Sequence, residues 1–309
     1  MEQLYQRDVY GKTIVELGKK DKNIIVFDAD LSGSTRTALF AKEFPDRFFN
    51  FGIAEQNMMA TAAGLASCGK TVFVSTFAMF ASARALDQVR NSICYNNLNV
   101  KIVATHSGVT VGEDGASHQA LEDVNFMRAI PNMKVIIPCD GAETKNAVIA
   151  AYENDGPFYV RLGRAKVNTL SEKKDFVFGK GYQMCEGKDL AIIACGVMVE
   201  EAIIAASVLK EKGISVSVYN VHTIKPIDSE LIINIAKKYG KILVCEEHQV
   251  TGGLYSAVAE ILANKYPVFI EHIGVEDKFG QSGLPKELME CYGLSSSCIA
   301  KKAEQISRR

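Results

Sequence analysis

The sequence has 309 residues and a formal net charge of -1. A chain of this length exceeds what one hydrophobic core usually organises, so we expect two domains. Its hydrophobic share of 48% and charged share of 23% are ordinary for a globular protein and argue against extended disorder. The balanced charge provides no basic surface for nucleic acid or an anionic membrane, so we expect neither as a partner.

The N-terminal residues and the cysteines indicate the compartment. Residues 1–8 are charged where a secretory signal would be apolar, and no apolar run reaches the length of a membrane span. The eight cysteines are widely spaced and form no Cys-x-x-Cys pair, which is typical of reduced, mostly buried thiols. We therefore expect a cytoplasmic protein. Because no Cys and His group has zinc-ligand spacing, we expect this chain to hold no metal.

Short apolar runs alternate with longer helical patterns through the first half of the chain. The predicted strands are residues 24–28, 71–75, 100–105, 134–138 and 158–162. The predicted helices between them are residues 54–67, 79–94 and 142–152. Alternating strands and helices predict an α/β fold with a parallel sheet covered on both sides. Ligands bind at the carboxyl ends of strands in such sheets, where residues 28–34, 75–80 and 106–118 fall.

Charged residues interrupt this pattern at 171–175 and again at 186–189. We therefore predict a domain at 1–170, a linker at 171–188 and a second, smaller α/β domain at 189–309. The second domain repeats the alternation. Its expected strands are residues 190–195, 214–219, 241–246 and 267–273, and its expected helices are 200–212, 228–238 and 254–264.

Glu55 stands at the start of an otherwise apolar helix of small residues, residues 54–66. Burial disfavours the charged form of a carboxyl, so Glu55 could hold a proton and share it with a ring nitrogen. The alternative is a solvent-exposed glutamate that the helix dipole stabilises.

Six motifs occur in one order along the first domain. They are Asp30-Leu31-Ser32-Gly33-Ser34, Gly52-Ile53-Ala54-Glu55-Gln56, Ser75-Thr76-Phe77, Thr105-His106, Gly112-Glu113-Asp114-Gly115-Ala116-Ser117-His118-Gln119 and Pro138-Cys139-Asp140. This series resembles the pyrimidine-binding domain of transketolases, which depend on thiamine diphosphate. The last third is similar to the transketolase C-terminal domain, which chiefly supports the dimer, so the resemblance covers essentially the whole chain.

A full-length transketolase also has an N-terminal domain with a Gly-Asp-Gly motif, and this sequence has no such motif. The resemblance is therefore to the C-terminal subunit of a split transketolase, which would be catalytically incomplete alone. It implies that a separate N-terminal subunit holds the cofactor's diphosphate and Mg2+. It also implies an α2β2 heterotetramer, with this subunit pairing at its centre.

The resemblance assigns cofactor roles to four residues. Glu55 would promote the imino form of the cofactor's aminopyrimidine, which removes the thiazolium proton. Phe77, with Phe80 as a second candidate, would stack on the pyrimidine, whereas the alternative for both is core packing. Asp30 would face the thiazolium and sugar side of the cofactor, and its alternative is a turn residue. The chain departs from many transketolases by having Ala81-Ser82-Ala83 where an aromatic residue contacts the cofactor.

The resemblance also implies sugar-binding residues. Asp114 and His118 would bond hydroxyl and carbonyl oxygens near the reacting carbons of a ketose, although they could be solvated loop residues. Arg7, Ser34, His106 and Arg164 would anchor the phosphate of a sugar phosphate. Arg161 competes with Arg164 for this role, and a surface salt bridge is the usual fate of a lone arginine. His248 follows a predicted strand of the second domain, a placement that recurs in related thiamine enzymes, and we assign it no direct catalytic role.

The expected reaction is transfer of a two-carbon ketol unit from a ketose phosphate to an aldose phosphate, with pentose phosphate pathway sugars as substrates. One alternative is a subunit of another thiamine diphosphate enzyme, either a deoxyxylulose-phosphate synthase-like protein or a 2-oxoacid dehydrogenase beta subunit. Residues 112–118 and Arg164 favour transketolase. The other alternative is a non-catalytic regulatory subunit, against which the retained Glu55, Asp114 and His118 argue.

Overall fold

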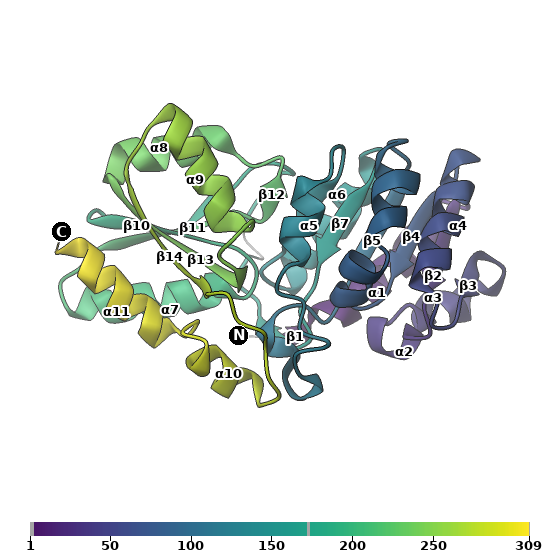
Figure 1. The fold of residues 1–309 in the computed structure, drawn as a ribbon, viewed down its shortest axis with the longest axis horizontal. Coiled ribbons are helices and arrows are strands. Elements are labelled where there is room, and N and C mark those ends of the chain that lie inside the picture. The colour runs from purple at the N-terminus through teal and green to yellow at the C-terminus, as the bar shows by residue number, and fades with distance from the viewer. Residues whose placement is uncertain (1–2, 172–173, 309) are drawn as a thin grey trace.

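The computed structural model describes residues 3–171 and 174–308, which form two α/β units side by side (Figure 1). Each unit is built on one β-sheet with helices on both faces. A third, two-stranded sheet joins β1 (Gln3–Tyr5) to β8 (Lys166–Asn168) in antiparallel register. The predicted α/β fold class, with a second, smaller α/β unit after the first, is confirmed.

The first sheet has seven strands in the order β12-β6-β7-β5-β4-β2-β3. Its strands are β2 (Ile24–Asp28), β3 (Phe48–Asn50), β4 (Thr71–Ser75), β5 (Val100–Ala104), β6 (Lys134–Ile136), β7 (Phe158–Arg161) and β12 (Thr223–Lys225). All pairs are parallel except β12 with β6. Every residue of β2, β4, β5 and β7 is buried, which explains their continuous apolar runs.

Helices cover both faces of this sheet. One face packs against α1 (Gln6–Lys20) and α6 (Gly141–Glu153) through a core that includes Ile14 and Val148. The opposite face packs against α4 (Glu55–Ser67), α5 (Asp123–Ala129) and the π-helical segments η2 (Phe80–Arg84) and η3 (Gln88–Cys94). The shorter elements are α2 (Ser32–Thr35), α3 (Ala38–Glu43), η1 (Pro45–Arg47) and η4 (Val109–Asp114).

The second sheet has the order β14-β13-β10-β11-β9, with only β9 antiparallel. Its strands are β9 (Tyr182–Cys185), β10 (Leu190–Ala194), β11 (Val216–Asn220), β13 (Lys241–Gln249) and β14 (Phe269–Val275). One core joins the sheet to α7 (Met198–Glu211), α10 (Pro285–Cys291) and α11 (Ser296–Ser307). The other core contains buried residues of α8 (Ser229–Tyr239) and α9 (Leu254–Lys265).

The stretch predicted as one helix at residues 79–94 is helical, but it is divided into two segments, η2 and η3, whose turns are π-helical. The expected boundary at 171–188 stays a prediction, and its residues 172–173 lie outside the described part of the chain. Strand β12 comes from the C-terminal half of the sequence, yet it pairs with β6 of the first sheet. Backbone hydrogen bonds between these two strands therefore join the two units.

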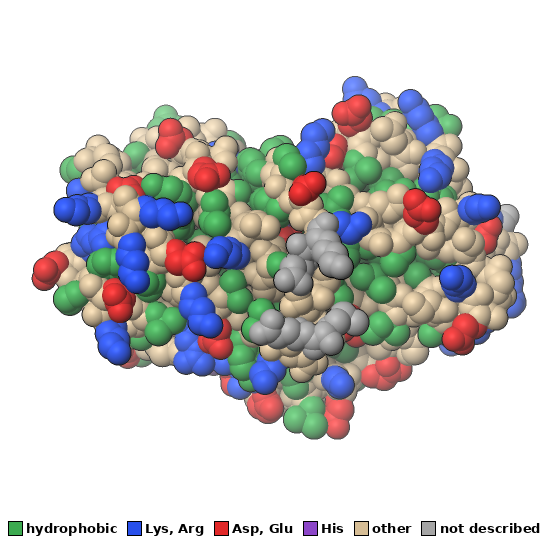
Figure 2. All heavy atoms as spheres, turned by 180° about the vertical axis from the view of Figure 1, so that it is seen from behind, with side chains coloured by type: hydrophobic (Ala, Val, Ile, Leu, Met, Phe, Trp, Pro, Cys, Tyr) green, Lys and Arg blue, Asp and Glu red, His purple; other side chains and the backbone are tan. Residues whose placement is uncertain are grey.

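The surface matches the balanced composition. Figure 2 shows acidic and basic side chains interspersed over the face opposite to that of Figure 1. Across residues 3–171 and 174–308, no helix is both long and apolar enough to cross a membrane.

Candidate functional site

Strands β2, β4 and β5 are neighbours in the first sheet and run parallel, so their carboxyl ends meet at one edge. The segment after β2 contains Asp30 and Ser34, the segment after β4 contains Phe77 and Phe80, and the segment after β5 contains His106, Asp114 and His118. The fold therefore gathers most of the predicted site residues at the edge where parallel sheets bind ligands.

Glu55 is the first residue of α4, and it is 1% exposed. The expected burial of Glu55 is confirmed, and the alternative of a solvent-exposed glutamate is excluded. Its Oε1 accepts a hydrogen bond from Arg84 Nη1 at 2.8 Å. Its Oε2 is buried and has no hydrogen-bond partner among the described residues. One carboxylate oxygen is therefore held by the protein, and the other remains available to a ligand.

Arg84 is the residue that sequence reasoning missed. Its guanidinium carbon lies 4.2 Å from the centre of the Phe80 ring, and its side chain is 46% exposed. Phe80 and Arg84 lie at the two ends of η2, whose π-helical turn is wider than that of an α-helix and brings residues four apart onto one face. The one sequence signal for Arg84 is its position four residues after Phe80, and that spacing is common in helices.

Phe77, Phe80, His106 and His118 form an aromatic cluster. The rings of Phe77 and Phe80 are stacked, with centroids 5.9 Å apart and planes at 20°. The Phe77 ring also stacks on His106 at 3.9 Å, and His118 meets Phe80 edge-on at 5.3 Å. Phe77 is buried, whereas Phe80 is half-buried. Phe80 therefore presents the more accessible ring of the two, although the sequence favoured Phe77 as the stacking residue.

His106 has a left-handed backbone, with φ of 58°, and its side chain is buried. Its Nδ1 lies 2.9 Å from Thr105 Oγ1, and its Nε2 lies 3.5 Å from Arg7 Nη1. Burial, together with the nearby charges of Arg7 and Arg164, lowers the pKa of His106 to about 3. The imidazole is therefore neutral at physiological pH and can accept a hydrogen bond from Arg7.

Arg7 and Arg164 line a cavity of about 310 Å³ at the same edge of the molecule. The other lining residues are Tyr5, Thr110, Ala165, Lys166 and Pro285. Burial, and secondarily the charge of Arg36, lowers the pKa of Arg7, whose Nε is buried without a partner among the described residues. Arg164 donates to the Val111 carbonyl and to Glu113 Oε2, both at 2.7 Å. Two guanidinium groups thus face one cavity, which suits an anion.

Asp30, Ser34 and Asp114 belong neither to the aromatic cluster nor to the lining of the two-arginine cavity. Asp30 is exposed, has φ of 64°, and its carboxylate lies 3.4 Å from Asn50 Nδ2. Buried Asp28 shapes the loop that carries Asp30, because it accepts hydrogen bonds from Leu31 N and two threonine hydroxyls. Ser34 is half-buried in α2, and Asp114 is exposed at the end of η4.

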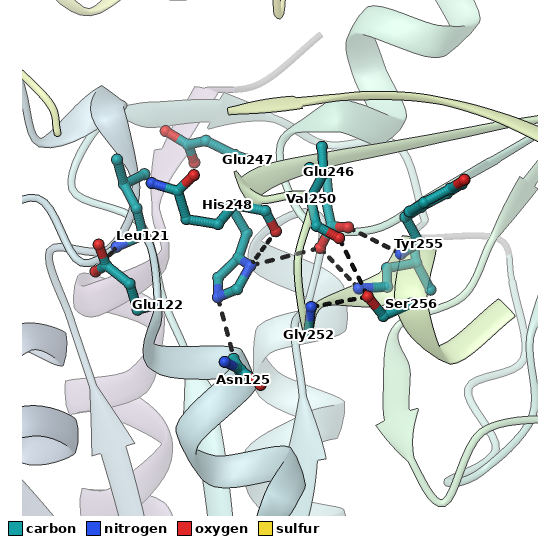
Figure 3. A network of polar contacts seen from close by, with 12 residues as sticks. Leu121, Glu122, Asn125, Glu246, Glu247, His248, Val250, Gly252, Tyr255 and Ser256 are labelled. Atoms are coloured by element: carbon teal, nitrogen blue, oxygen red, sulfur yellow. Dashed lines mark hydrogen bonds and ion pairs between the residues drawn. The ribbon is translucent and has the colours of Figure 1, made fainter. Parts of the chain in front are cut away.

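Two further candidates have structural roles. Arg161 is buried and ion-paired with Asp123 at 2.8 Å, so it does not compete with Arg164 for a ligand. His248 on β13 is buried, and burial lowers its pKa to about 4. Its Nδ1 lies 2.6 Å from the Gln249 carbonyl and its Nε2 accepts from Asn125 N at 3.4 Å (Figure 3). This neutral imidazole joins the second unit to α5 of the first.

The residues present fit the pyrimidine end of thiamine diphosphate. A buried carboxylate oxygen without a partner can bond a ring nitrogen, and a half-buried aromatic ring within reach of the same arginine can stack on a flat heterocycle. Glu55 and Phe80 are therefore the residues that would hold this part of the cofactor.

Comparison with known proteins matches residues 2–169 to the transketolase pyrimidine-binding domain and residues 179–299 to the transketolase C-terminal domain. The chain is 52% identical to a putative transketolase C-terminal section from Methanocaldococcus jannaschii, over 96% of this chain and 94% of that protein. It is 41% identical to a 6-deoxy-6-sulfo-D-fructose transketolase subunit from Clostridium sp., over 100% of this chain and 96% of that protein.

Among solved structures, the chain is similar to a split-gene transketolase described as an inactive beta4 tetramer. The TM-score is 0.90, the identity is 46%, and the match covers 99% of each chain. The two matched domains follow each other in the order that the sequence motifs predict, and the relatives match this chain over nearly its whole length. The chain belongs to the transketolase family and is similar, over nearly its whole length, to the C-terminal subunits of split transketolases.

Proposed function

We propose that the chain is the C-terminal, pyrimidine-binding subunit of a two-chain transketolase that transfers a two-carbon ketol unit between an anionic ketose and an aldose phosphate. The observation that carries the proposal is Glu55, a buried carboxylate with one free oxygen, beside Phe80 and at the same sheet edge as the two-arginine cavity. The near-complete match to split relatives supports a separate N-terminal partner.

Thiamine diphosphate, when bound, supplies a thiazolium carbon that can attack a sugar carbonyl. Glu55 would hold a proton at the pyrimidine nitrogen, and Phe80, backed by Phe77, would fix the plane of that ring. Asp30 would face the thiazolium side. The N-terminal subunit would hold the diphosphate and Mg2+, so this chain alone would be inactive, and the working assembly would be an α2β2 heterotetramer in the cytoplasm.

Arg7 and Arg164 would bind the anionic end of the sugar, assisted by Ser34 and by the neutral imidazole of His106. The guanidinium fork matches the oxygens of a phosphate or a sulfonate in pairs. His118 and Asp114 would bond sugar oxygens near the reacting carbons. The arginine pair supports an anionic substrate class. The pentose phosphate pathway sugars are our first choice within that class, and the relative named for a sulfo-sugar makes a sulfonated ketose the second.

A reconstitution assay tests the proposal. The chain would be mixed with the N-terminal transketolase subunit from the same cells, thiamine diphosphate and Mg2+, and supplied with a ketose phosphate and an aldose phosphate. We expect two-carbon transfer with both chains and none with either alone. Condensation of pyruvate with the aldose phosphate would instead identify a deoxyxylulose-phosphate synthase-like subunit, and oxidative decarboxylation would identify a 2-oxoacid dehydrogenase beta subunit. No reaction, despite assembly and cofactor binding, would indicate a regulatory subunit.

A further inference from the structure

Arg84 makes the two contacts that the proposed function assigns to the pyrimidine of the cofactor. It donates a 2.8 Å hydrogen bond to Glu55 Oε1, and its guanidinium carbon lies 4.2 Å from the centre of the Phe80 ring. A guanidinium is planar, carries N–H donors and stacks on aromatic rings, and an aminopyrimidine shares each of these properties.

The other face of Phe80 is closed to a ligand. The Phe77 ring is stacked against it, with centroids 5.9 Å apart. A third ring inserted between them would need about 7 Å, twice the contact distance of about 3.5 Å between carbon atoms. The edge of the Phe80 ring meets His118 at 5.3 Å. A heterocycle that stacks on Phe80 and also reaches Glu55 must therefore use the face that Arg84 covers.

Arg84 is free to leave this position. Its side chain is 46% exposed, whereas that of Glu55 is 2% exposed. In the part of the chain that the structure describes, its side chain forms one ion pair, with Glu55, and one cation-π contact, with Phe80, and Gln56 donates only to its backbone carbonyl. The adjoining Ala81-Ser82-Ala83 carries no large side chain that would block the movement. The arginine can swing into solvent while η2 keeps its shape.

We propose that Arg84 fills the pyrimidine subsite between Phe80 and Glu55 in the cofactor-free chain, and that thiamine diphosphate binds by displacing it. This inference rests on the proposed function. In the free state the arginine keeps the Glu55 carboxylate paired, since a buried carboxylate without a partner is costly. Thiamine diphosphate therefore competes with a side chain of the protein itself for Glu55 and Phe80, and its apparent affinity is reduced by that competition.

The test compares three variants of the two-chain complex, Arg84→Met, Arg84→Lys and Arg90→Gln, with the wild type. Arg84→Met keeps a side chain of similar length without donors, and Arg84→Lys keeps the charge without the planar group. Arg90 is exposed on the neighbouring segment η3, where its side chain contacts Asn91, so Arg90→Gln is the matched control. Calorimetric titration with thiamine diphosphate at saturating Mg2+ gives Kd, and thermal unfolding gives Tm with and without cofactor.

We expect Arg84→Met to bind thiamine diphosphate about tenfold more tightly than the wild type, with Arg84→Lys between the two and Arg90→Gln unchanged. Without cofactor, Arg84→Met should unfold at a lower temperature because Glu55 loses its partner, and saturating cofactor should abolish that difference. Equal or weaker binding by Arg84→Met would overturn this inference alone, since Arg84 would then contribute to the bound state or to neither state. Absence of binding by the wild type and by Arg84→Met would overturn the proposed function together with it.

Discussion

Arg161 on β7 and Asp123 on α5 form an ion pair of 2.8 Å in which both side chains are buried. Tyr159 also donates to Asp123, and Arg161 Nη2 donates to the carbonyls of Ala120 and of Glu247 in β13. The pair thus joins the first sheet, α5 and the second unit at one point. Arg161 is therefore buried in an ion pair, whereas Arg164, three residues later, lies at the edge of a cavity.

Replacing Arg161 should destabilise the fold, whereas replacing Arg164 should not. Arg161→Gln leaves Asp123 as a buried charge without its ion-pair partner, so we expect a loss of about 3–5 kcal/mol in the free energy of unfolding. Arg164→Gln breaks a pair with exposed Glu113 and should cost less than about 1 kcal/mol. Denaturant unfolding of both variants measures this contrast, and similar losses for the two would contradict the structural assignment.

Arg164→Gln should instead weaken binding of the anionic sugar. The guanidinium faces the cavity that it shares with Arg7, so its loss should raise KM for a ketose phosphate by about tenfold, as expected for a charged hydrogen bond. The Kd of thiamine diphosphate should stay unchanged. Lys145→Gln, which breaks an exposed ion pair with Glu16 on residues that do not line this cavity, is the control. Equal KM values for the wild type and Arg164→Gln would remove Arg164 from the site.

Glu55→Gln should abolish turnover without preventing assembly. Glutamine has nearly the same shape and keeps an acceptor for Arg84, but it cannot exchange a proton with a ring nitrogen. We expect kcat of the two-chain complex to fall by roughly 10²–10⁴, the usual contribution of a proton-transferring side chain. Steady-state kinetics and gel filtration measure the two effects, with Glu43→Gln, an exposed glutamate on α3, as the control. Wild-type kcat in Glu55→Gln would refute the catalytic role.

Glu246 should make the stability of the chain depend on pH. Burial raises its pKa from 4.5 to about 7, although the carboxylate accepts hydrogen bonds from Leu254 N and Tyr255 N at the start of α9 (Figure 3). Because the folded state binds the proton more tightly than the unfolded state, this contribution is fully present below pH 4.5. It is lost as the pH rises to about 7.

The variant Glu246→Gln should remove that contribution. As the pH rises from 4.5 to 7, the wild type should lose up to about 3 kcal/mol in free energy of unfolding relative to the variant, since one pKa unit is worth about 1.4 kcal/mol. Other buried carboxyls affect both proteins alike and cancel in the difference. Glu287→Gln, at an exposed position in the first turn of α10, should give a flat difference. A flat profile for Glu246→Gln would show that burial does not raise this pKa.

Much of the fold could be predicted because the strands are short and buried on both faces. The predicted strands 24–28 and 71–75 coincide with β2 and β4, whose residues are all buried. Helix α1 was not predicted, and its mixed sequence, Gln6–Lys20, contains two glycines that pack closely against neighbouring segments. The π-helical turns of η2 and η3 could not be predicted from the spacing of the apolar residues, because that spacing is equally compatible with an α-helix.

The candidate site was partly predictable for a related reason. The order of the motifs and strands in the sequence predicts that Glu55, Phe80, His106 and Arg164 lie at the carboxyl ends of the strands, since topology alone determines which loops meet there. The accessibility of the Phe77 and Phe80 rings depends on the stacking of His106, which sequence cannot give. The same limit applies to Arg84, whose contact with Glu55 arises from tertiary packing between η2 and α4.

Native mass spectrometry of the chain purified from its own cells, with thiamine diphosphate and Mg2+ present, tests the central claim most directly. We predict a complex of two copies of this chain with two copies of a second chain, carrying thiamine diphosphate that neither chain retains alone. An assembly of this chain only, with no cofactor and no second chain under conditions that preserve other heteromeric complexes of the cell, would contradict the account.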